Sequence, residues 1–179
     1  MARQGAAEAD SIADALRDAL ARGSLPGELD GFSDEDAHAA AAFVHQAAAV
    51  RTPGTPAITI ESEAPLHRNG GKARKAVPAA SAHPLRIAII NDDMPFLVDS
   101  IANCLAQQGL VIQRLMHPVL SVERDAKGRL LGILPFDSPG ARRESIIYIE
   151  VDRATARQRK GLAAEIAGTL AHVRAAVID

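Results

Sequence analysis

A buried strand that leads directly into an amphipathic helix constrains the fold more than any other feature of the sequence. Residues 85–91, LRIAIIN, are rich in β-branched side chains and predict a strand. A helix is then predicted from Met94 or Pro95 to about Gln108, with Gly109 in the position where helices commonly end. Its apolar face at helical spacing consists of Leu97, Ile101, Cys104 and Leu105.

The residues after Gly109 extend this pair to a β-α-β-β-α order. Apolar and polar residues alternate over 110–124, which predicts a half-buried strand with Pro118 at an edge or a bulge. A hairpin turn at 125–128 (DAKG) and a returning strand (RLLGILP) follow. The last elements predicted are a strand at 144–152 and a helix from about residue 154 to the C-terminus.

This order is most of a ferredoxin-like unit, an α+β fold with an antiparallel sheet and helices on one face. The final strand of such a unit is missing. The strand at 85–91 would then be an apolar edge, which natural proteins avoid. We therefore expect the chain to be an N-terminal piece of a longer protein, or a partner to cover this edge.

The first half of the chain predicts two helices and a short strand. Helices are expected at about 7–22 and at 37–50, the second with Ser33 as its N-cap and Asp36 three residues later. The stretch AITIES at 57–62 favours a strand. We predict a helical segment at 1–56, a short strand plus flexible linker at 57–84, and an incomplete ACT-like domain at 85–179.

Residues 63–84 carry no apolar periodicity, and a structureless stretch of this length is uncommon inside a compact domain. They contain a basic cluster without aromatic residues. Its members are Arg68, Lys72, Arg74 and Lys75. A solvated linker is the preferred interpretation, and a nucleic-acid adaptor is a distant alternative.

The net charge, the cysteine count and the lack of long apolar runs exclude several classes of protein. A net charge of -2 provides no field that would recruit nucleic acid or an acidic membrane surface. One cysteine cannot form an intrachain disulfide. The N-terminus lacks the apolar run of a secretory signal, and no stretch approaches the ~18 apolar residues of a membrane span. A cytoplasmic protein is expected.

The strand–helix junction is the candidate site. It consists of Asn91, Asp92, Asp93, Met94, Pro95 and Phe96. A metal or acid–base site needs carboxylates that converge on one point, whereas carboxylates at a helix start can accept hydrogen bonds from unpaired N–H groups. We therefore interpret Asp92 and Asp93 as capping and loop residues, and we expect Asp99 to point outward. No catalytic, metal or cofactor-binding residue is assigned.

Other reactive side chains favour structural roles. Cys104 lies on the apolar face of the predicted helix, as an inert core thiol does. His117 stands alone on a strand. The pair Arg142 and Arg143 is a weak candidate for binding an anion. No serine stands in a G-x-S-x-G elbow, so a hydrolase triad has no nucleophile.

The block from NDDMPFLVDS (91–100) to HPVL (117–120), with ESIIYIEVDR at 144–153, resembles a known family. It is similar to the first ACT-like domain of the large NAD-specific bacterial glutamate dehydrogenases. The resemblance covers about residues 86–153 and extends weakly to the helix AAFVHQAAAVRTPG. It implies a parent enzyme that deaminates L-glutamate to 2-oxoglutarate and ammonium while it reduces NAD⁺.

The same resemblance implies that this segment is not catalytic. The cofactor fingerprint and catalytic lysine of the family are absent from these residues, so NAD would bind elsewhere in the parent. Its partners would be the remaining domains and further copies in a homo-oligomer.

ACT domains often bind amino acids where the first strand meets the first helix, with a glycine in the pattern D-x-P-G-L. Here Asp93 and Pro95 match that pattern, and Phe96 replaces the glycine. The bulky ring favours domain packing, so we expect an architectural or regulatory segment. The alternative is a stand-alone module that senses an amino-acid effector at 91–95.

Overall fold

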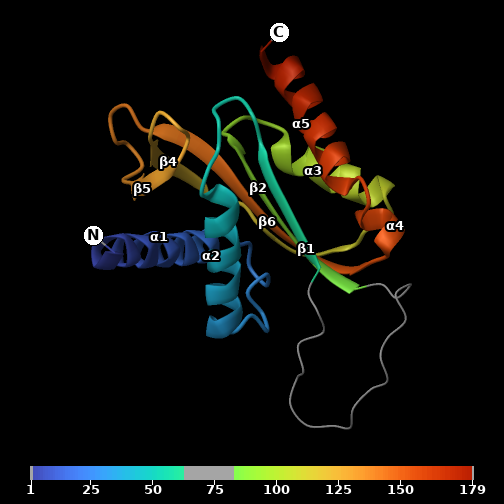
Figure 1. The fold of residues 1–179 in the computed structure, drawn as a ribbon. Helices are drawn as coiled ribbons and strands as arrows, with labels where there is room; N and C mark the ends of the chain where they lie inside the picture. The colour runs from blue at the N-terminus through green and yellow to red at the C-terminus, as the bar shows by residue number, and fades with distance from the viewer. Residues whose placement is uncertain (1, 63–82, 179) are drawn as a thin grey trace, which may run out of the picture.

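The computed structural model describes residues 2–62 and 83–178, with five helices and six strands among them (Figure 1). The helices are α1 (Ala2–Arg22), α2 (Asp34–Ala48), α3 (Leu97–Gln107), α4 (Ala156–Arg159) and α5 (Leu162–Ile178). The strands are β1 (Ala57–Ser62), β2 (His83–Asp92), β3 (Ile112–Met116), β4 (Val119–Arg124), β5 (Leu130–Leu134) and β6 (Arg142–Ala154).

All six strands form one antiparallel sheet in the order β1-β2-β6-β4-β5, and β3 also pairs with β6. The long strand β6 bonds to β2 along one side and to β3 and then β4 along the other. The single strand predicted at 110–124 is therefore two. Pro118 interrupts it, because proline has no N–H to donate to the ladder.

The edge of β2 is covered by β1, which pairs with it from Ala57 opposite Ile90 to Ser62 opposite Leu85. The expectation of an exposed apolar edge at 85–91 is wrong. Within the described residues no strand follows α5, and β1 occupies the place of the final ferredoxin-like strand. The stretch AITIES was predicted as a strand, but its distant partner was not.

One face of the sheet packs against α3 and α5, as the predicted ferredoxin-like fold requires (Figure 1). Alternate residues of β2 and β6 point to this face, and they meet the apolar stripes of both helices. The predicted stripe of α3 is confirmed in full. The buried residues include Leu85, Ile87, Ile89, Leu97, Ile101, Cys104, Leu105, Ile147, Ile149, Leu162, Ile166 and Leu170.

The opposite face of the sheet packs against α1 and α2 (Figure 1). The intervening residues of β2 and β6 point this way and meet Leu16 and Leu20 of α1 and Phe43 and Val44 of α2. The sheet is thus buried between two helical layers, with the N-terminal helices on a face that the sequence analysis left uncovered. The division at 56 and 84 stays a prediction, although these contacts join its parts.

Several helix ends follow the predicted chemistry. Ser33 and Asp36 form a capping box at α2, in which each side chain accepts from the backbone N–H of the other. Gly109 has the left-handed φ of 70° that suits glycine after α3. The predicted C-terminal helix is wrong at its start, because β6 continues to Ala154 and Gly161 then separates α4 from α5.

The predicted linker lies mostly outside the described residues, and its last two positions, 83 and 84, belong to β2. Among the helices of the described part of the chain, none is long and apolar enough to cross a membrane.

Candidate functional site

The candidate loop connects β2 to α3, and its backbone differs from the predicted form. The helix begins at Leu97 rather than at Met94 or Pro95, and Phe96 is the N-cap residue. Phe96 has a left-handed φ of 67° and makes no side-chain cap hydrogen bond. The interpretation of Asp92 and Asp93 as caps is therefore wrong. Both carboxylates instead bind side chains from other elements.

Asp92 belongs to a chain of ion pairs that we call the arginine–carboxylate network. Its members are Arg51, Asp92, Arg124, Glu144 and Arg174. Glu144 is 1% exposed and accepts hydrogen bonds from Arg51 Nη1 at 2.6 Å and from Arg124 Nη2 at 2.8 Å. Asp92 accepts from Arg51 Nη2 and from Arg174 Nη2, each at 2.6 Å.

Other guanidinium donors of Arg51 and Arg124 bind backbone carbonyls at and after the end of α2 and in the turn after β4. Arg51 Nε donates to the carbonyl of Thr55, and Arg124 Nη1 donates to those of Ala48 and Gly128. Within the described residues, every buried side-chain N or O atom has a hydrogen-bond partner. The network therefore joins the end of α2, the sheet and α5.

The pKa of Asp92 reflects these contacts. Burial by itself raises the pKa of this carboxyl, but the hydrogen bonds from Arg51 and Arg174 outweigh burial and hold the pKa below its ordinary value. Asp92 is thus an ionised structural acid, not a proton donor near neutral pH.

Asp93 has a different set of partners from Asp92. They lie in β6 and, through Ser145, between β3 and β4. Its Oδ1 accepts from Ser145 Oγ at 3.1 Å, its Oδ2 lies 3.2 Å from Arg143 Nη2, and His117 Nε2 lies 3.1 Å from Ser145 Oγ. The two adjacent aspartates therefore tie the loop to two different sets of elements.

The Asp93–Ser145–His117 chain is not a catalytic triad. The hydroxyl of Ser145 has one hydrogen, and Asp93 accepts it, so His117 Nε2 must donate to Ser145. A histidine that donates to a serine cannot remove its proton. Ser145 is also fully buried. These three side chains hold the loop in place.

His117 provides a pH-dependent prediction. Burial lowers the pKa of His117 below 6.5, and the nearby charge of Asp93 offsets this only in part. The unfolded chain therefore binds the proton first as the pH falls. The contribution of His117 to stability is complete above about pH 6.5 and is lost as the pH falls through the lowered folded pKa.

We expect the melting temperature to fall between about pH 7.5 and about pH 5.5, and His117→Gln to make this fall smaller. Burial also lowers the pKa of His45. The matched variant His45→Gln should therefore remove the part of the fall in melting temperature that His45 contributes. An unchanged pH profile in His117→Gln would show that the pKa of this imidazole does not differ between the folded and the unfolded chain.

The remaining predicted residues are placed as follows. Asp99 is exposed as expected, and Cys104 is a buried free thiol. Asn91 is buried, with its side chain bonded to the carbonyl of Asp92. Arg143 binds Asp93 and lies over the ring of Phe136, 4.6 Å from its centroid. In the described part of the chain, no three His, Cys, Asp or Glu side chains are placed to hold a metal ion.

The sequence analysis missed Arg51, Arg124, Glu144 and Arg174. Arg51 and Glu144 are 93 positions apart, and nothing in the local pattern of either predicts the other. The one available signal was a charged residue, Glu144, shortly before the apolar run IIYI of the predicted strand.

Comparison with known families decides what this fold belongs to. The family model described as "Glutamate dehydrogenase, ACT1 domain" matches residues 17–166, from within α1 to within α5. The chain belongs to this ACT1 domain family. The match includes β1, α2 and the last residues of α1, so α2 on the second face of the sheet lies within the ACT1 region.

Two curated relatives are similar to about half of this chain. An NAD-specific glutamate dehydrogenase of Pseudomonas aeruginosa is 42% identical over 96 residues, and one of Halomonas elongata is 39% identical over 97 residues. Each match covers 52% of this chain, and the chain spans about 6% of the length of either relative. No solved structure is significantly similar to the chain.

Proposed function

We propose that this ACT1 domain is the N-terminal regulatory and architectural segment of an NAD-dependent glutamate dehydrogenase, and that it has no catalytic activity of its own. The parent reaction would convert L-glutamate, NAD⁺ and water to 2-oxoglutarate, ammonium and NADH. The family match and the names of both relatives support this proposal. NAD and the catalytic residues would lie in other domains, and the enzyme would act in the cytoplasm as a homo-oligomer.

The architectural role is supported most directly by the conformation and exposure of Phe96. A left-handed conformation costs a non-glycine residue about 1–2 kcal/mol, and the ring is 67% exposed. The neighbouring Pro95 is exposed as well. An outlying backbone conformation that presents an aromatic ring to solvent is typical of a contact surface. In this proposal, the ring packs against another domain of the same polypeptide.

Phe96→Gly separates the cost of the left-handed backbone from the role of the exposed ring. In the isolated chain, glycine relieves the backbone strain, and we expect the free energy of unfolding to rise by about 0.5–1 kcal/mol. Phe96→Ala keeps a Cβ at the same φ and is the matched control, with no such gain expected. Denaturant unfolding of the two variants measures this difference.

In the parent enzyme the same two variants should both weaken assembly, because each removes the ring. Analytical ultracentrifugation and limited proteolysis would report this loss. An assembly that is unaffected by either variant would contradict an interface role for Phe96. NADH formation from glutamate and NAD⁺ by the isolated 179 residues would contradict the non-catalytic assignment.

One observation favours the second candidate, an amino-acid-sensing module. The N-terminus of α3 has no side-chain cap, and free N–H groups at a helix N-terminus can bind a carboxylate. A thermal-shift panel of amino acids tests this function. Stabilisation that Asp93→Ala abolishes would support sensing at 91–95, whereas a flat panel would support the architectural role.

A further inference from the structure

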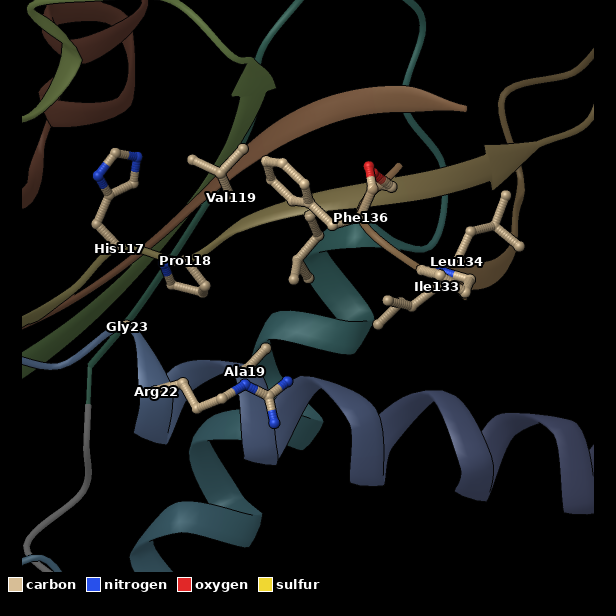
Figure 2. A pocket seen from close by; sticks show the side chains of 12 residues that line it. Ala19, Arg22, Gly23, His117, Pro118, Val119, Ile133, Leu134 and Phe136 are labelled. Carbon is tan, nitrogen blue, oxygen red and sulfur yellow. The ribbon is translucent and has the colours of Figure 1, made fainter. Parts of the chain in front are cut away.

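A groove lies between α1 and β5, and no residue of the candidate loop lines it. It consists of two hollows, of about 500 Å³ and about 140 Å³, which share Ile133. The larger is shown in Figure 2. Helix α1 and Gly23 after it line the hollows on one side, and β5 with the residues after it lines them from Leu131 to Phe136. We call this surface the α1–β5 groove.

The length of the α1–β5 groove indicates an elongated occupant. Ser11 and Gly23 are separated by about 18 Å along the helix, and an extended segment of about five to six residues has this length. A small molecule would occupy one hollow and leave the other empty. β5 is also the outermost strand on its side of the sheet, where a further extended segment can pair.

The lining of the α1–β5 groove is mainly apolar. Leu131 is 50% exposed and Phe136 is 58% exposed, so both present apolar surface to solvent in the groove. Ala15 and Ala19 face them from α1, and their small size leaves the space open. The other apolar lining residues are Ile12, Pro118, Val119, Leu120, Ile133, Leu134 and Pro135.

The charge of the groove is positive. Arg22 lies on the α1 side beside Ala19 (Figure 2), and among the described residues that line the groove none is acidic. Arg22 has no ion-pair partner among the side chains that the structure describes. His117 also lines the larger hollow, but its ring points away from Arg22 and binds Ser145. Arg22 is therefore available to a carboxylate.

We propose that the α1–β5 groove binds an extended, acidic and apolar segment from another part of the same glutamate dehydrogenase polypeptide. The acidic side chain pairs with Arg22, and the apolar side chains enter the two hollows. This inference rests on the proposed function, because the chain spans about 6% of its relatives' length and the rest of such a polypeptide supplies the segment. Covalent linkage raises the effective concentration of a weakly binding segment.

Photo-crosslinking in the parent polypeptide tests the proposal. A photoreactive phenylalanine analogue replaces Phe136 or Leu131, and mass spectrometry identifies the peptide that it captures. Leu25, which is 69% exposed and does not line the groove, is the control position. We expect both groove positions, and not Leu25, to capture one peptide of the same polypeptide that contains Asp or Glu.

The charge reversal Arg22→Glu should lower the crosslink yield roughly fivefold, and Arg22→Lys should retain most of it. Absence of a crosslink, capture of a second copy of this domain, or equal yields in the two Arg22 variants would each overturn the proposal. The same analogue at Phe96 tests the proposed function separately. A crosslink from Phe96 without one from Phe136 would reject the groove and keep the architectural role.

Discussion

Glu144→Ala is expected to lower the free energy of unfolding by about 3–5 kcal/mol, because it leaves buried arginines without their carboxylate. Arg51 and Arg124 both donate to Glu144, and their side chains are 1% and 2% exposed. Removal of one member of a buried ion pair costs more than the pair itself contributes. Denaturant unfolding followed by circular dichroism measures the change.

Glu123→Ala is the matched control for Glu144, since Glu123 is an exposed glutamate in the neighbouring strand β4. We expect its effect to lie within about 0.5 kcal/mol. Replacement of Arg51, Arg124 and Glu144 together by Met, Met and Leu should recover most of the loss, because apolar residues of similar volume need no charged partner. A Glu144→Ala variant as stable as Glu123→Ala would show that the network is open to solvent.

Ile101→Ala is expected to cost about 2–5 kcal/mol of unfolding free energy. Ile101 of α3 is fully buried in the core that α3 forms with the sheet and α5. Truncation therefore removes apolar contacts and leaves a cavity that close-packed neighbours fill only in part. Ile101→Val, which removes one methyl group, should cost about 0.5–1.5 kcal/mol. The same denaturant experiment compares both variants.

Val111→Ala is the control for the core truncation, because Val111 is 63% exposed. Its expected effect is within about 0.5 kcal/mol. If Ile101→Ala and Val111→Ala lost equal stability, the face of α3 that packs on the sheet would be assigned wrongly.

The two aspartates of the candidate loop show where sequence reasoning ends. Their position at the junction between a strand and a helix was predicted. Their partners were not, because Arg51, Arg174 and Ser145 come from segments more than 40 positions away. The N-cap was also missed, since a phenylalanine in left-handed conformation contradicts the local preference on which the prediction rested.

The sequence by itself determined the strand at 85–91 and the helix that follows it, the buried face of α3, the capping box of α2 and the family resemblance. These features depend on periodicity and on contacts between neighbours a few positions apart. Only the tertiary structure decided that β1 completes the sheet, that α1 and α2 cover its second face, and that five charged side chains meet under the loop. Such pairings depend on which distant surfaces can be buried together, and the pattern within one segment does not record its partner.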